Sequence, residues 1–170
     1  MRKTMLLPAI FGFVGWLLLI PPGAVAQTKI TGSLDCEKAD PMHVIQIPER
    51  EGFSYVIAQY KCSWDASIEE FKTKDYLNIV FSEAMGASVR TTATGVARLS
   101  NGDRLYSHNT GTRDPKTLTS TGKWTYTLGT GKLRGIKGEG TYTCKRKSAE
   151  PDAGITCTSE GVYTPPAGKK

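Results

Sequence analysis

"GTGKLRGIKGEGTYTC", residues 129–144, is the stretch that decides the fold. Its five glycines lie among basic residues, a composition found in phosphate-binding loops and in bent strands. A Walker loop needs Ser or Thr after its Gly-Lys pair, but Lys132 is followed by Leu133. A dinucleotide-binding loop needs a third glycine where Arg134 stands. The stretch therefore predicts a strand that bends at its glycines, and we expect no cofactor and no nucleic-acid partner.

The cysteines predict how this strand pairs. An exported chain with an even number of cysteines is expected to form disulfides, and no two of the four have the close spacing of a zinc-binding pair. Pairing Cys144 with Cys157 in one hairpin fixes three more cross-strand pairs: Tyr142 with Ser159, Gly140 with Gly161, and Gly138 with Tyr163. The Tyr163 ring is then expected to cover Gly138, as aromatic residues do at bends of a sheet.

The other two cysteines, Cys36 and Cys62, pair by elimination. A hairpin that turns at residues 48–52 brings them together if the chain bulges at Asp40-Pro41. We expect two disulfides and no metal.

The N-terminus has the features of a secretion signal. Arg2 and Lys3 precede an apolar run over residues 9–20, and Ala24-Val25-Ala26 forms a small-residue cleavage site. The run is shorter than the roughly 20 residues of a membrane-spanning helix. We expect a signal peptide over 1–26, a mature chain without a transmembrane segment, and a secreted or periplasmic location.

Period-two alternation of β-forming residues dominates the rest of the chain. The expected strands are 29–35, 43–47, 53–62, 76–85, 88–99, 103–110, 122–128, 138–146 and 155–163. Residues 67–74 fit either one helical turn, from the capping-box pattern Ser67-Ile68-Glu69-Glu70, or a strand. Glycines inside strands favour a barrel over a sandwich. The sequence predicts one all-β barrel domain over 27–163 and a flexible tail over 164–170.

The expected interior is aromatic. Trp124, Tyr126 and Leu128 alternate with polar residues, which gives this strand one apolar face. Five further residues are expected to join it inside: Tyr55, Ile57, Leu77, Ile79 and Phe81. Such a face forms either a packed core or the wall of a cavity for one small ligand. The candidate ligand-pocket residues are Tyr55, Phe81, Trp124 and Tyr126, and Lys123 or Arg104 is expected to neutralise a ligand carboxylate at the rim.

The positive charge is concentrated in one segment. Residues 113–147 hold nine Lys or Arg against Asp114 and Glu139, a net charge of +7. This segment is either an ordinary solvated strand surface or a site for an anionic partner. The candidates for that partner are Lys132, Arg134, Lys137, Lys145, Arg146 and Lys147.

Catalytic groups are scarce in the sequence. There is no G-x-S-x-G elbow, and the histidines are His43 and His108. A triad with Ser54 or Ser107 has no support from spacing, since Ser107 and His108 point to opposite faces of a strand. Metal binding by both histidines with Asp103 competes with plain surface polarity. No catalytic residue is assigned.

Two stretches carry a family resemblance: "GVARLSNGDRLYSHNTGT" (95–112) and "GKWTYTLGTGKLRGIKGEGTYT" (122–143). They resemble the allene oxide cyclase and dirigent-like β-barrel superfamily, and in particular its uncharacterised secreted bacterial members. The resemblance implies an eight-stranded antiparallel, calycin-like barrel, often oligomeric, with an internal apolar cavity. Plant members include a cyclase of fatty-acid-derived epoxides and proteins that steer phenoxy radical coupling. No functional residue matches by position, so no activity is transferred.

These observations predict an exported, non-enzymatic barrel that binds a small apolar or amphipathic molecule and is a candidate homo-oligomer. One alternative is a cyclase or isomerase that acts on a fatty-acid-derived or phenolic ligand. Another is attachment to envelope polymers through the basic 113–147 surface.

Overall fold

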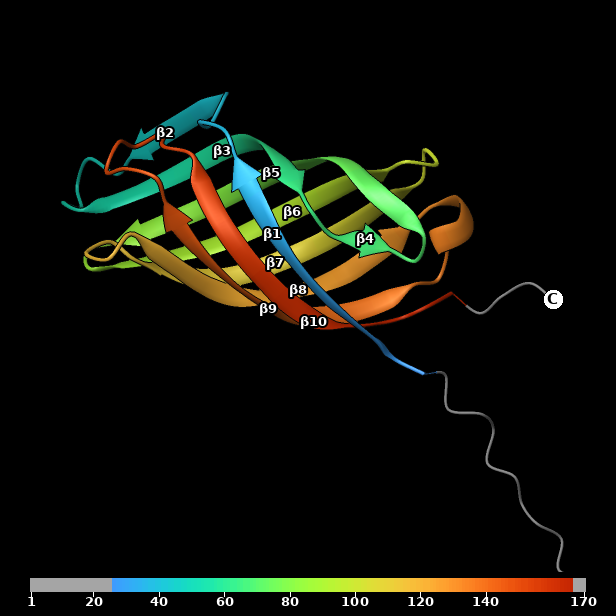
Figure 1. The fold of residues 1–170 in the computed structure, drawn as a ribbon. Coiled ribbons are helices and arrows are strands. Elements are labelled where there is room, and N and C mark those ends of the chain that lie inside the picture. The colour runs from blue at the N-terminus through green and yellow to red at the C-terminus, as the bar shows by residue number, and fades with distance from the viewer. Residues whose placement is uncertain (1–25, 167–170) are drawn as a thin grey trace, which may run out of the picture.

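The computed structural model describes residues 26–166, which form an antiparallel β-barrel (Figure 1). The expected signal peptide, apart from Ala26, and the last four residues of the expected tail lie outside this range. The elements are β1 Thr28–Cys36, β2 Met42–Gln46, β3 Phe53–Trp64, β4 Ser67–Ile68, β5 Phe71–Met85, β6 Ser88–Leu99, β7 Arg104–Asp114, β8 Thr119–Gly129, the 3₁₀ turn η1 Gly131–Leu133, β9 Lys137–Arg146 and β10 Ile155–Thr164. All nine expected strands are confirmed. Within the described part of the chain, no helix is long and apolar enough to cross a membrane.

The sheet closes because β3 pairs with both β1 and β5. The closed ring runs β3-β1-β10-β9-β8-β7-β6-β5, so the expected eight-stranded barrel is confirmed. The short strands β2 and β4 pair with β3 and β5 outside the ring. Hydrogen-bonded closure of this kind satisfies the backbone groups that an open sheet leaves unpaired at its edges.

The seam between β1 and β3 is short. Its ladder has three residue pairs: Leu34 with Trp64, Asp35 with Ser63, and Cys36 with Cys62. The chain then bulges through residues 37–41, and β2 resumes pairing along β3 with Met42 opposite Ala58. The bulge predicted at Asp40-Pro41 is thus confirmed, and so is the disulfide between Cys36 and Cys62.

The hairpin of β9 and β10 has the predicted register. Cys144 lies opposite Cys157 and is bonded to it, and the predicted pairs Tyr142 with Ser159, Gly140 with Gly161, and Gly138 with Tyr163 all occur. Gly138 is contacted by the ring of Tyr126, whose Cδ2 would lie 2.6 Å from an added Cβ, and by Tyr163, whose own Cβ would lie 2.9 Å from it. The expected pairing of Tyr163 with Gly138 is confirmed, and Tyr126 is a second aromatic residue at this glycine.

Residues 67–74 do not form a helical turn. Ser67 and Ile68 form β4, a tight turn with Glu69 at φ 52° follows, and Phe71 begins β5 opposite Ile68. Ile68 is fully buried in this position. Burial of the Ile68 side chain at this end of the barrel therefore overrides the local capping-box pattern of Ser67 and Glu70.

One end of the barrel is plugged by side chains. Ile68, Leu99 and Leu133 are fully buried there, and Leu133 comes from η1 between β8 and β9. Thr28 pairs with Tyr163 at the same end, so both ends of the described chain leave the barrel here (Figure 1). The opposite end carries the 147–154 loop between β9 and β10 (Figure 1). We call these the closed end and the mouth.

Side chains alternate between the interior and the outer surface, but one predicted face is reversed. On β3 the interior side chains are Ala58, Tyr60 and Cys62, and their cross-strand partners on β5 are Val80, Asn78 and Tyr76. The alternate residues, namely Tyr55, Ile57, Leu77, Ile79 and Phe81, therefore lie on the outer face. Ile57, Ile79 and Phe81 are exposed there. The expectation that these five line the interior is wrong, because apolar residues occupy both faces of β3 and β5.

Leu128 also points outward. The ladder between β7 and β8 pairs Tyr106 with Leu128 but Ser107 with Tyr126, so Thr127 is an extra residue on β8. This bulge reverses the alternation after Tyr126. Leu128 is accordingly 54% exposed, and Gly129 faces inward in its place.

Candidate functional site: the barrel interior

The barrel encloses a cavity of about 140 Å³ lined by residues of all eight ring strands. A cavity of about 150 Å³ is large enough to hold a benzene-sized molecule. The lining contains aromatic, small apolar, hydroxyl and amide side chains with two arginines, and no Asp, Glu or His of residues 26–166 is part of it. The lining extends from Leu105 near the closed end to Arg113 and Arg146 near the mouth.

The wall contains six aromatic side chains: Tyr60, Trp64, Tyr76, Trp124, Tyr126 and Tyr142. Four of them form two contacting pairs, with ring centroids 4.8 Å apart for Trp124 and Tyr126 and 5.9 Å apart for Trp64 and Tyr76. Their π faces and edges offer a large contact area to an apolar ligand.

Glycines on neighbouring strands make room for these rings. An added Cβ at Gly140 or Gly161 would lie 2.5 Å from Cζ2 of Trp124. Gly32 meets Trp64, Gly95 meets Tyr76, and Gly111 and Gly122 meet Tyr142 in the same way. The glycines thus let these rings pack directly against the backbone of neighbouring strands, where a side chain would push them toward the cavity.

Several polar atoms of the wall have no protein partner. The Tyr76 hydroxyl and Ser107 Oγ share a hydrogen bond of 3.1 Å. By contrast, Asn78 Oδ1, Trp124 Nε1 and the Tyr126 hydroxyl are buried and have no hydrogen-bond partner among the described residues. Buried polar atoms normally have a partner, so these are free to bind polar groups of a ligand.

Burial raises the pKa of two tyrosines of the wall. Removal from water raises the pKa of Tyr126 and of Tyr76, and two hydrogen bonds to Tyr76 oppose its shift. A tyrosine hydroxyl with a raised pKa stays protonated at neutral pH and can donate as well as accept a hydrogen bond.

Two arginines lie at the mouth on neighbouring parts of the wall. Arg113 is on β7 opposite Ser120 of β8, and Arg146 is on β9 two residues beyond Cys144, the other partner of Ser120. Both are partly buried and line the cavity. The positive charges of both act on the hydroxyl of Tyr60, although burial dominates and raises the pKa of Tyr60.

The predicted pocket residues divide into two groups. Trp124 and Tyr126 line the cavity. Tyr55 and Phe81 stack on each other on the outer surface, with ring centroids 5.7 Å apart, and they do not reach it. Neither Lys123 nor Arg104 lines the cavity, so the rim charges proposed from the sequence are replaced by Arg113 and Arg146.

Sequence reasoning missed Tyr60, Trp64, Tyr76, Tyr142 and Arg113 as cavity residues. Three of them could have been found from the sequence, because each lies two residues from a cysteine and so shares its strand face. Tyr142 shares a face with Cys144. Tyr60 and Trp64 share a face with Cys62. Both disulfides lie on the interior face. The strand face that carries the cysteines therefore identifies the interior better than the alternation of apolar and polar residues does.

The candidate anion-binding residues do not form one group. Lys132, Arg134 and Lys137 are exposed around η1 at the closed end, whereas Lys145 and Lys147 are exposed near the mouth. They lie at opposite ends of β9, roughly 30 Å apart for ten residues. Lys132 Nζ is 3.8 Å from Glu70 Oε1, and Lys147 Nζ is 2.6 Å from Asp35 Oδ1. Arg146 belongs to the cavity instead.

The histidines do not approach the cavity. His43 on β2 and His108 on β7 are exposed on the outer face, and Ser107 faces inward toward Tyr76. Ser107 and His108 thus point to opposite sides of β7, as predicted. Asp103 bonds to Asn101 and to the Lys132 amide in the turn at the closed end. Within residues 26–166 no group of His, Cys, Asp and Glu side chains is arranged to hold a metal ion.

Comparison with known proteins gives remote structural neighbours. No protein-family model and no curated protein sequence matches this chain significantly. Among solved structures, the pterocarpan synthase dirigent protein GePTS1 matches with a TM-score of 0.49 and 13% identity, over 83% of this chain and 92% of that chain. The pterocarpan synthase dirigent protein PsPTS1 matches with a TM-score of 0.48 and 14% identity, over 84% and 97%. At this level neither match assigns a family, and the barrel rests on the strand pairing itself.

Proposed function

We propose that this chain is an exported, non-enzymatic barrel that binds one small, mostly apolar molecule in its interior. The observation that supports this most directly is the cavity, which persists although six large aromatic side chains line it. A barrel stabilised by packing alone gains most from a filled interior, since interiors normally pack without large voids.

The wall also has the mixed chemistry of a ligand site. Rings supply apolar contact, and a few buried donors and acceptors remain without protein partners to orient a ligand. The cyclase or isomerase alternative stays a prediction, as do superfamily membership and homo-oligomer formation.

Tryptophan fluorescence tests the proposal directly. Trp64 and Trp124 both line the cavity, and Trp16 lies in the expected signal peptide. Titration with 3-phenylpropan-1-ol and with 3-phenylpropanoate is expected to change the emission saturably for at least one of them.

A cavity-filling variant locates the binding. Ala93 lies on the cavity wall, so Ala93→Leu is expected to weaken binding of the phenylpropyl probes about tenfold or more. Ala87→Leu makes the same change at an exposed turn and is expected to have no effect. Equal binding by both variants, or no saturable response to either probe, would contradict binding in the barrel.

A further inference from the structure

Two arginines, Arg113 and Arg146, line the cavity at the mouth without a carboxylate beside them in the cavity wall. Arg113 is partly buried, and its inner-face neighbours on the adjacent strands are Val89 and Ser120. No ion pair or hydrogen bond of its guanidinium occurs among residues 26–166. Burial lowers the pKa of Arg113, and the positive charge of Arg146 lowers it further. A partly buried charge beside a like charge destabilises the empty protein.

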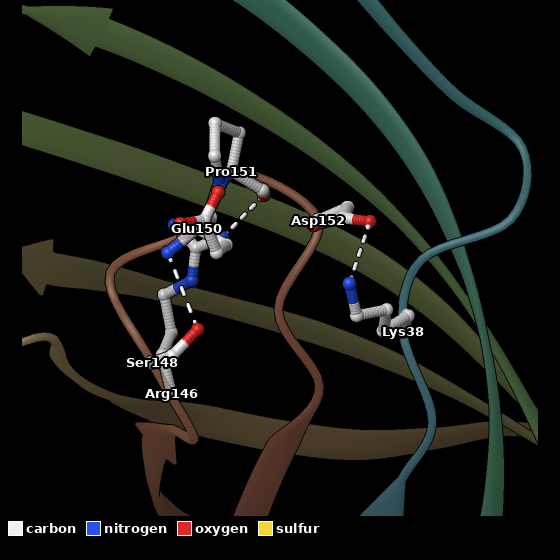
Figure 2. A network of polar contacts seen from close by, with 6 residues as sticks. All are labelled: Lys38, Arg146, Ser148, Glu150, Pro151 and Asp152. Atoms are coloured by element: carbon white, nitrogen blue, oxygen red, sulfur yellow. Dashed lines mark hydrogen bonds and ion pairs between the residues drawn. The ribbon is translucent and has the colours of Figure 1, made fainter.

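Arg146 is held without a carboxylate. One of its terminal amino groups donates to the backbone carbonyls of Glu150 and Pro151 in the 147–154 loop (Figure 2). Its Nε is buried and has no partner among the described residues. The loop therefore orients the guanidinium at the mouth but does not neutralise it.

Nearby carboxylates are paired with lysines. Asp152, in the same loop, lies 3.5 Å from Lys38 Nζ (Figure 2), and Asp35 lies 2.6 Å from Lys147 Nζ. The 147–154 loop is held in place at Asp152, whose backbone carbonyl accepts a hydrogen bond of 2.8 Å from the Ala39 amide. Asp35 and Asp152 are thus paired with lysines and do not line the cavity, whereas Arg113 and Arg146 do. The negative charge of Asp152 still acts on the Tyr60 hydroxyl, against the positive charges of the two arginines.

We propose that the mouth is a carboxylate site, and that the ligand of this barrel is a small amphipathic monocarboxylate. The inference rests on the proposed function, because it specifies the ligand of that same cavity. The carboxylate binds between Arg113 and Arg146 with the neutral Tyr60 hydroxyl as a further donor. The apolar part extends inward against Trp124, Tyr76 and Tyr142. Guanidinium groups suit this role because they bind carboxylate oxygens through directed, charge-assisted hydrogen bonds.

The test compares two probes that differ only in the polar group. We expect 3-phenylpropanoate to bind at least tenfold more tightly than 3-phenylpropan-1-ol at low ionic strength, and the difference to shrink as salt is added. Arg113→Gln is expected to reduce carboxylate affinity about tenfold or more and to leave alcohol affinity unchanged. The matched control Arg134→Gln removes an exposed charge at the closed end and is expected to change neither.

Thermal unfolding without ligand separates this role from a structural one. Since Arg113 has no protein partner and faces a like charge, Arg113→Gln is expected to fold and to melt at the same or a higher temperature. Equal affinity for the two probes, or an acid preference that survives in Arg113→Gln, would overturn the carboxylate site while binding in the barrel stands. Failure of both probes to bind would overturn the proposed function and this inference with it.

Discussion

Trp124 shows how single residues shape the cavity. Its ring lies over Gly140 of β9 and Gly161 of β10, which are cross-strand partners. A side chain at either position would push the ring toward the cavity. The absence of a side chain at both glycines therefore maintains the space that the ligand is proposed to fill.

Gly140→Ala is expected to lower the free energy of unfolding by about 1 to 3 kcal/mol, because the new methyl group meets both Trp124 and the Glu160 carbonyl. Trp124 emission should shift as the ring moves. Chemical denaturation with fluorescence detection measures both effects. The exposed neighbour Thr141→Ala is the control, expected within about 0.5 kcal/mol of the wild type. Equal stability of the two variants would refute the packing of Trp124 on glycine.

At the scale of elements, the two disulfides stabilise different parts of the barrel. Cys144–Cys157 lies inside a ladder of ten residue pairs, whereas Cys36–Cys62 ends a seam of three. Each bond closes a short loop, which the chain-entropy model values at about 3 kcal/mol. Only the seam bond also holds the barrel closed where hydrogen bonding is sparse.

Replacing both cysteines of the seam, Cys36→Ala with Cys62→Ala, is expected to speed amide exchange in β1 and in the C-terminal part of β3. The double variant Cys144→Ala with Cys157→Ala is expected to lose similar global stability while β9 and β10 stay protected. Hydrogen exchange followed by mass spectrometry distinguishes these outcomes. Equal local exchange at the seam in both variants would show that three backbone pairs suffice for closure.

The elements also show where sequence reasoning succeeds and fails. Strand positions and the register of β9 with β10 follow from local signals, namely turn residues and the spacing of Cys144 and Cys157. The inward face of β3 does not, because Ile57 and Tyr60 are both plausible core residues and only barrel closure chooses between them. Arg113 was missed for a related reason, since Arg146, the other arginine at the mouth, comes from another hairpin.

At the scale of the whole molecule, the buried tyrosines make stability depend on alkaline pH. Burial raises the pKa of Tyr76 and Tyr126 above the unfolded value of about 10, so both stay protonated in the folded barrel. Their contribution is complete below pH 10 and is lost as pH rises toward the folded pKa. In that window each tyrosine lowers the free energy of unfolding by about 1.4 kcal/mol per pH unit.

We therefore expect the protein to unfold cooperatively above pH 10, with tyrosinate absorbance appearing together with the loss of circular dichroism. Replacement of the exterior Tyr55 by Phe should leave the midpoint unchanged, while Tyr126→Phe should move it to higher pH. Gradual ionisation of all tyrosines in a folded barrel would contradict this expectation.

The position of Thr28 and Tyr163 has a practical consequence. The start of β1 and the end of β10 both lie beside the plug of Ile68 and Leu133. A fusion partner or a solid support attached next to either strand end would therefore lie at the closed end, away from the mouth. An immobilised molecule would face its arginines outward into the bulk medium. Capture of ligands from a flowing sample should then proceed without obstruction by the tether.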